Sequence, residues 1–135
     1  RTPMQWEAGS NAGFTASGAT PWLPVLSGSD SLNVTAQLED SESLLMANRS
    51  LLRLRDQEPA LKWGSLKWLE QYNRGEILAY ERIYRDQSVT VLINFSGEAK
   101  DLPLSENEEL LFASGPASLE GGTLRLGPDS GILLR

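Results

Sequence analysis

Hydrophobic residues recur at helical spacing between residues 41 and 57. The apolar positions fall three or four residues apart, with two neighbours that widen the stripe: Leu44, Leu45, Ala47, Leu51, Leu52 and Leu54. This periodicity predicts a helix with one apolar face. Asp40 or Ser41 is expected to cap its first turn, and Pro59 is expected to stop it. The apolar face needs a packing partner.

Residues 61–135 show patterns typical of strands. Residues 89–95 alternate with a period of two, which predicts an inner face formed by Val89, Val91, Ile93 and Phe95. A second run rich in β-formers covers 77–84, and residues 85–87 read as the hairpin connection between the two. Further turns are expected at 120–122 and 127–129. Several short strands at this spacing predict an antiparallel β-sandwich.

Residues 1–39 lack such periodicity and are rich in Gly, Ser, Pro and Asn. This composition predicts a long irregular loop, which we expect Trp6, Phe14 and Trp22 to anchor. Loops of this length are uncommon unless they are functional or belong to a larger body. The expected fold is therefore mainly β, with a long loop and one helix before a sandwich.

Composition narrows the function classes. The chain has 135 residues and a formal net charge of −6, and its basic residues form no large patch, which argues against nucleic-acid binding. It has no Cys and no His, so disulfides, thiolate chemistry and the commonest metal ligands are absent. We expect no metal and no cofactor. No apolar run is long enough to cross a membrane, and we expect a cytoplasmic location.

A series of short motifs follows in a fixed order along the chain. The motifs are RTPMQW at 1–6, NAGFT at 11–15, PWLPV at 21–25, NVTAQ at 33–37, LAYER at 78–82 and INFS at 93–96. They resemble motifs of the α-glucosidases and their relatives in glycoside hydrolase family 13. The resemblance is dense over the first 64 residues, extends into the strand region, and covers nearly the whole chain.

The resemblance implies a domain assignment. Residues 1–60 would be the C-terminal remnant of the (β/α)8 catalytic barrel, with a loop at 1–39 and the last barrel helix at about 41–57. Residues 61–135 would be the β-sandwich called domain C. The rest of the barrel would precede Arg1 and would be the packing partner of the apolar helix face.

The resemblance also implies where the chemistry lies. Retaining glycosidases use two carboxyl groups about 5–5.5 Å apart, and the family places them in barrel strands upstream of Arg1. We therefore expect no catalytic residue in this chain. Arg1 is the one substrate-binding candidate, because a guanidinium fork can bind two sugar hydroxyls. Gln5 and Trp6 are expected to hold the loop, and Glu7 departs from the Asp usual there.

Three other features have a structural explanation that we prefer. Trp63 and Trp68 could stack on sugars, but core or domain-interface packing is expected. The acidic cluster Glu106, Glu108 and Glu109 is expected to be a solvated loop. Asn33, Asn48 and Asn94 each begin a glycosylation sequon, which we attribute to chance.

The predicted function is the C-terminal part of a retaining α-glucosidase that cleaves α-glucosidic bonds of oligosaccharides. The parent protein would be an enzyme, and this chain alone is expected to be inactive. One alternative is a trehalose synthase or another transglycosylase of the same family. Others are a non-catalytic family relative and a carbohydrate-binding module, although the sequence offers no convincing aromatic platform for the module.

Overall fold

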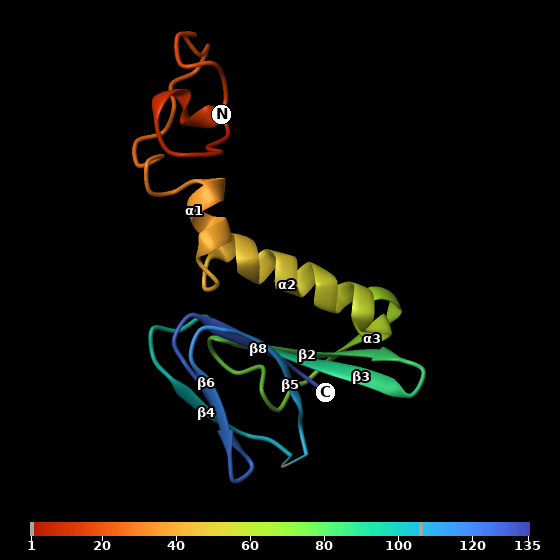
Figure 1. Ribbon diagram of the computed structural model, residues 1–135. Coiled ribbons are helices and arrows are strands. Elements are labelled where there is room, and N and C mark those ends of the chain that lie inside the picture. The colour runs from red at the N-terminus through yellow and green to blue at the C-terminus, as the bar shows by residue number, and fades with distance from the viewer. Residues whose placement is uncertain (1, 106) are drawn as a thin grey trace. The chain divides into compact units, whose positions relative to one another are not determined.

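The computed structural model describes residues 2–105 and 107–135. The chain forms two compact units that divide between Ser50 and Leu51. Every helix precedes the first strand, as Figure 1 shows by colour. These helices are the 3-10 helix η1 (Ser10–Gly13), α1 (Val34–Glu39), α2 (Leu44–Gln57) and α3 (Pro59–Trp63).

The second unit contains the predicted antiparallel β-sandwich. A five-stranded sheet has the order β1-β2-β3-β8-β5, and a three-stranded sheet has the order β4-β7-β6 (Figure 1). The strands are β1 (Ser65–Trp68), β2 (Ile77–Tyr84), β3 (Gln87–Asn94), β4 (Lys100–Pro103), β5 (Leu110–Ser114), β6 (Ala117–Glu120), β7 (Thr123–Leu126) and β8 (Ser130–Leu134). All neighbouring strands are antiparallel. The prediction of a mainly β fold is confirmed.

The core lies between the two sheets and corrects one prediction. Its buried members come from both sheets and the β1–β2 connection: Leu69, Ile77, Ala79, Leu92, Leu124, Leu126, Ile132 and Leu134. Leu92, and not the predicted set of Val89, Val91, Ile93 and Phe95, supplies the core side of β3. That set lies on the opposite side of the sheet, where α3 packs on β2 and β3 and buries Val89.

The predicted turns are confirmed in position. Arg85 and Asp86 connect β2 to β3, and Arg85 takes a φ of +57° without being glycine. Gly121 and Gly122 connect β6 to β7 with φ values of +54° and +73°. A pair of positive φ angles matches the right-handed twist of the strands and is accessible to glycine at little cost.

Helix α2 begins later than expected, at Leu44. The Ser43 hydroxyl accepts a hydrogen bond from the Met46 backbone N–H at 3.3 Å, and the Gln37 side chain accepts one from Leu45 at 3.0 Å. The prediction that Asp40 or Ser41 caps the helix is therefore wrong. The Asp40 carboxylate instead accepts from the backbone of Glu42, within the turn before the helix.

Pro59 does more than follow the end of α2. It occupies the start of α3, where a missing backbone N–H costs nothing. Gly64 lies between α3 and β1. A side chain would not fit here, because a Cβ at this position would lie 2.3 Å from the Ala60 carbonyl oxygen. The sequence periodicity did not predict α1 or α3, which have six and five residues.

The apolar face of α2 is only partly covered by the described residues. None of the residues of α2 is buried. Leu44 is 75% exposed and Leu52 is 63% exposed, whereas the other members of the predicted stripe are half-buried, namely Leu45, Ala47, Leu51 and Leu54. The predicted apolar stripe therefore exists, and Leu44 and Leu52 stay exposed.

Backbone hydrogen bonds and Asn side chains hold the first unit, in place of the expected aromatic anchors. The Trp6 N–H donates to the Ala12 carbonyl at 2.8 Å, and the Val34 N–H donates to the Gln5 carbonyl at 3.0 Å. The rings of Trp6, Phe14 and Trp22 are 50%, 50% and 89% exposed. The prediction that these aromatic residues anchor the loop is wrong for the chain as described.

Candidate functional site

The single substrate-binding candidate, Arg1, lies outside the described residues, but the segment around it can be followed from Thr2 onward. A small pocket of about 140 Å³ is lined by parts of three motifs, at 1–6, 11–15 and 21–25. Thr2 and Pro3 form one side of it, and Phe14 and Trp22 contribute aromatic rings. The fold of the first unit therefore brings the motif segments together.

Asn11 organises the turn within the second motif. Its side-chain amide donates to the Thr15 hydroxyl at 3.1 Å and to the carbonyl oxygens of Ala16 and Ala19 at 2.9 and 2.8 Å. Its backbone φ is +57°, a conformation that Asn adopts more readily than most residues. Asn11 therefore fixes the loop conformation, and its amide is not free to bind a ligand.

Asn33 likewise fixes the backbone of the fourth motif, residues 33–37. It is 3% exposed, its side-chain oxygen accepts from the Ala36 N–H at 2.9 Å, and its amide donates to the Ser29 carbonyl at 2.9 Å. Asn33 is thus the N-cap of α1. The next residues join α1 to the first motif, because the Thr35 N–H and hydroxyl both donate to the Trp6 carbonyl.

We expect Asn33→Ala to destabilise α1 by about 1 kcal/mol, the usual cost of removing a good N-cap. Amide hydrogen exchange at Ala36 would measure this directly, because that N–H loses its acceptor. Asn48→Ala is the matched control, since Asn48 lies on the exposed surface of α2. Unchanged protection of Ala36 in Asn33→Ala would contradict the capping role.

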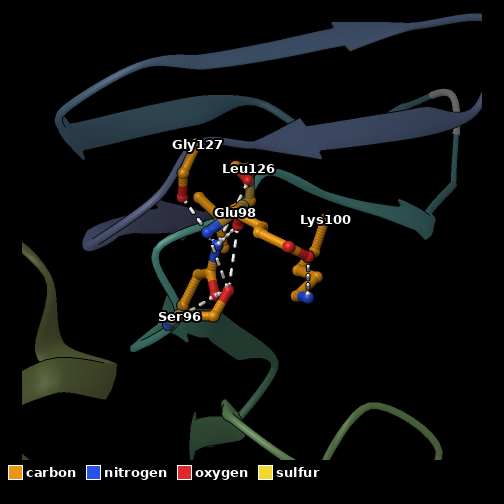
Figure 2. A network of polar contacts seen from close by, with 6 residues as sticks. Ser96, Glu98, Lys100, Leu126 and Gly127 are labelled. Carbon is orange, nitrogen blue, oxygen red and sulfur yellow. Dashed lines mark hydrogen bonds and ion pairs between the residues drawn. The ribbon is translucent and has the colours of Figure 1, made fainter.

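A buried polar network surrounds Asn94, the last residue of β3 (Figure 2). The Asn94 amide donates to the Glu98 carbonyl at 2.8 Å and the Gly127 carbonyl at 2.7 Å. Its oxygen accepts from the backbone N–H and the hydroxyl of Ser96 at 3.0 and 2.7 Å. Asn94 is fully buried. The INFS motif thus ties the end of β3 to the turn between β7 and β8.

The sequon prediction can now be judged from burial. Asn33 and Asn94 are 3% and 0% exposed, and both amides are engaged in hydrogen bonds. Asn48 lies within α2 and donates to the Leu44 carbonyl. In this fold, therefore, Asn33 and Asn94 are not accessible to a glycan, and their Asn-x-Ser/Thr pattern follows from capping and turn geometry.

Several described carboxylates form ion pairs with basic side chains. Glu58 is 8% exposed and pairs with Arg135 at 2.8 Å, and Arg135 also contacts Glu109 at 2.8 Å. These contacts raise the pKa of Arg135, the Glu109 hydrogen bond most strongly. The hydrogen bond from Lys62 lowers the pKa of Asp56, the opposite of what a general acid needs.

The acidic cluster is only partly described. Glu106 lies outside the described residues, and Glu109 is exposed but pairs with Arg135, so it is not a purely solvated charge. Within residues 2–105 and 107–135, no three metal-binding side chains come together to hold an ion. The same residues contain no helix with the length and apolar character needed to span a bilayer.

Trp63 and Trp68 are not core residues. Trp63 is 67% exposed at the end of α3, and Trp68 is 51% exposed in β1. Trp68 packs edge-on against Tyr80 of β2, with ring centroids 6.0 Å apart. The prediction of core packing is wrong for both. Packing at a domain interface stays a prediction.

The relatives align with most of this chain, but the alignment covers only a small share of their own length. The trehalose-6-phosphate hydrolase of Escherichia coli (strain K12) is 39% identical over 98 residues, which is 73% of this chain and 17% of that protein. A probable α-glucosidase of Rhizobium meliloti (strain 1021) is 38% identical over 82% of this chain. The oligo-1,6-glucosidase of Bacillus cereus is 31% identical over 93% of this chain and 23% of its own length. The chain thus spans about a fifth of these proteins.

Solved structures of related enzymes contain a region with the same fold as this chain. The trehalulose synthase of Pseudomonas mesoacidophila MX-45 superimposes on 99% of this chain with a TM-score of 0.85, at 28% identity and over 25% of its own length. A variant of that enzyme in complex with the substrate sucrose superimposes equally well, at 29% identity. Both are larger proteins that contain a region with this fold.

Two family models account for the two parts of the chain. The model of the α-amylase catalytic domain matches residues 1–64, and that of the α-amylase SusG C-terminal domain matches residues 77–132. Their order is the order that the motifs predicted. The chain therefore belongs to the α-amylase family, glycoside hydrolase family 13.

Proposed function

We propose that this chain is the C-terminal part of a retaining α-glucosidase that hydrolyses α-glucosidic bonds of short oligosaccharides. The observation that carries the proposal is the match of residues 1–64 to the catalytic-domain model, followed by the C-terminal-domain match at 77–132. Relatives named oligo-1,6-glucosidase and α-glucosidase support this substrate class. The catalytic carboxylates would lie in the barrel strands that precede this region in the family.

The proposed domain assignment follows the same boundaries as the sequence prediction. Residues 1–60 would complete the barrel, and residues 61–135 would be domain C. Exposed apolar side chains support a missing packing partner: Leu44 and Leu52 on α2 are 75% and 63% exposed, and Phe95 after β3 is 62% exposed. We assign the upstream barrel as that partner, because uncovered apolar area of this kind is costly in water.

Arg1 is proposed to bind the non-reducing-end glucose of the substrate in the longer protein. The motif around it is ordered by hydrogen bonds from Val34 and Thr35 to Gln5 and Trp6, which gives a fixed base for such a residue. A fixed guanidinium could hold two vicinal hydroxyls at once. A cytoplasmic location of the enzyme stays a prediction.

Transglycosylation is the second candidate, and one observation favours it. Two solved structures that are similar to this chain over 99% of its length are of trehalulose synthase variants, and one of them holds the substrate sucrose. Such an isomerase and the trehalose synthase considered above would share the barrel and the covalent intermediate of a retaining glycosidase. A non-catalytic relative remains a further alternative, and the residues at the upstream carboxylate positions would decide it.

The isolated chain is expected to release no p-nitrophenol from p-nitrophenyl α-glucoside above a mock preparation. The physical reason is that retaining hydrolysis requires two carboxyl groups about 5–5.5 Å apart, and the family places that pair in barrel strands that precede this region. The assay is absorbance at constant enzyme concentration over hours. Measurable release by the purified chain would contradict both this expectation and the placement of catalysis upstream.

The complementary test uses a longer protein that contains this sequence. That protein should hydrolyse isomaltose, and its products from isomaltose, trehalose 6-phosphate and sucrose would separate the three kinds of relative. Arg1→Ala in that protein should raise KM and lower kcat. Arg53→Ala, on exposed α2, is the matched control. Formation of a sucrose isomer in place of glucose would favour transglycosylation.

A further inference from the structure

A second cavity lies in the sandwich and is not part of the motif segments described above. It has a volume of about 600 Å³, within the range of about 300–1,000 Å³ usual for small-ligand sites. The connection between β1 and β2 forms one wall, and the edge strand β4 forms the other. All of its lining belongs to the unit from Leu51 to Arg135.

Hydrogen bonds hold the wall formed by the β1–β2 connection. The Asn73 amide donates to the carbonyl oxygens of Leu69 and Ala79 at 3.1 and 2.7 Å, and its oxygen accepts from the Ala79 N–H at 2.8 Å. The Ile77 N–H closes the tip by donating to the Arg74 carbonyl at 3.3 Å. The loop is therefore formed before any ligand arrives, which lowers the entropy cost of binding.

Tyr72 links the two walls. Its hydroxyl donates to the Pro103 carbonyl at 2.6 Å, so the ring extends from the loop to β4 and is fixed there. Tyr72 and Leu102 also pack against the core, and Ile77 is 8% exposed. These residues give the cavity an apolar base with an aromatic ring.

The rim of the cavity is polar and balanced in charge. Gln71, Arg74 and Glu76 are exposed, and among the described residues their side chains make no hydrogen bond or ion pair. Lys100 lies 3.5 Å from Glu98, and Asp101 binds Arg125 at 3.1 Å. The rim therefore offers an amide, a guanidinium and a carboxylate, which together can both donate and accept hydrogen bonds.

We propose that this cavity binds a neutral, α-linked gluco-oligosaccharide. A sugar presents apolar C–H faces that suit the Tyr72 ring and hydroxyls that both donate and accept, which matches the rim. A phosphorylated ligand would meet Glu76 and Asp101 as well as Arg74 and Lys100, so the rim offers no excess of positive charge that would favour it. The proposal rests on the proposed function only for the choice of α-linked glucose.

Titration of the 135-residue chain with maltotriose and isomaltotriose, followed by amide NMR shifts, tests the site. At least one sugar should cause saturable shifts confined to residues 71–77 and 100–103. Arg74→Ala and Gln71→Ala should each raise the dissociation constant about fivefold or more, the effect of losing one or two hydrogen bonds. Arg53→Ala and Gln57→Ala, both on exposed α2, are the matched controls and should bind like the parent chain.

Several outcomes would overturn the proposal: no saturable shift with either sugar, shifts located elsewhere, or binding that ignores both cavity variants. Inorganic phosphate and trehalose 6-phosphate form the third arm. Stronger shifts of the same amides by these anions would make the cavity an anion site instead. The readout is binding to this chain and involves no hydrolysis, so its failure is distinguishable from failure of the proposed glucosidase activity.

Discussion

Asn94→Ala is expected to lower the free energy of unfolding of the sandwich by about 2–4 kcal/mol. The side chain is fully buried and has five hydrogen-bond partners, namely the carbonyls of Glu98, Leu126 and Gly127 and two groups of Ser96. Its removal takes one partner from each of these groups in a site closed to water, although the Ser130 and Ser96 hydroxyls can still donate to the carbonyls of Gly127 and Glu98. Each buried group that is left unsatisfied costs about 1–3 kcal/mol. A total stability of about 5–15 kcal/mol makes this a large fraction.

Urea unfolding followed by hydrogen exchange at Val91 and Leu92 would measure the loss in the sandwich alone. Asn107→Ala is the control, because Asn107 is exposed and only its backbone N–H, which donates to Ser105, forms a hydrogen bond among the described residues. If Asn94→Ala does not fold, Ser96→Ala removes part of the same network and should cost less. Equal stability of Asn94→Ala and Asn107→Ala would show that the network adds nothing.

Asn94→Asp separates hydrogen bonding from volume. The carboxylate keeps the size of the amide and can still accept from Ser96, but it turns an oxygen toward the carbonyl oxygens of Glu98 and Gly127. We expect a loss at neutral pH at least as large as that of Asn94→Ala. Burial and the facing carbonyls should raise the pKa of the introduced carboxyl, so the loss should shrink as pH falls through that pKa.

The roles of the Asn residues explain why sequence reasoning reached the family but not the geometry. A motif such as residues 93–96 can be recognised from one short segment. Ser96 is the one partner of Asn94 within that segment, whereas the carbonyls of Leu126 and Gly127 lie 32 and 33 residues further along. The local pattern therefore identifies the motif, and it does not show which groups the Asn94 side chain binds. An Asn at a predicted strand end before a turn would have favoured the structural role.

Predicted elements were correct where neighbours in sequence determine them. The hairpin around residues 85–87 and the glycine turn at 120–122 depend on a few consecutive residues, and both are present. The inner face of β3 depends on what covers each side of the sheet. Apolar residues occupy both faces, because the second sheet covers Leu92 and α3 lies over the side of Val89. Alternation alone could not choose between these two faces.

The exposed aromatic residues also show what a sequence pattern alone cannot predict. Trp22 is 89% exposed, although its position among loop residues predicted an anchor. A buried side chain needs a partner surface, and sequence pattern does not say whether that surface lies within the same chain. Trp63 and Trp68 gave the same error for the same reason. The described residues bury none of these three rings, and packing of Trp63 and Trp68 at a domain interface stays a prediction.

Leu92→Ala is expected to cost about 3–4 kcal/mol of unfolding free energy, within the range of about 2–5 kcal/mol for a buried leucine. Leu92 is 0% exposed and packs in the core with Ala79, Leu126 and Ile132. The substitution removes its transfer free energy and leaves a cavity that close-packed neighbours fill only in part. Urea unfolding at a fixed temperature, with exchange at Ala79 as a local probe, would measure the loss.

Phe95→Ala is the matched control, and it tests which face of β3 points into the core. The sequence pattern placed Phe95 in the core and Leu92 outside it, whereas the structure leaves Phe95 62% exposed. We expect Phe95→Ala to cost less than about 1 kcal/mol, since surface changes have small effects. If Leu92→Ala does not fold, Leu92→Val can replace it. We expect Leu92→Val to lose about 1 kcal/mol of unfolding free energy, still more than Phe95→Ala. A larger loss in Phe95→Ala than in Leu92→Ala would reverse the assignment, because the free energy follows the side chain that is removed from water.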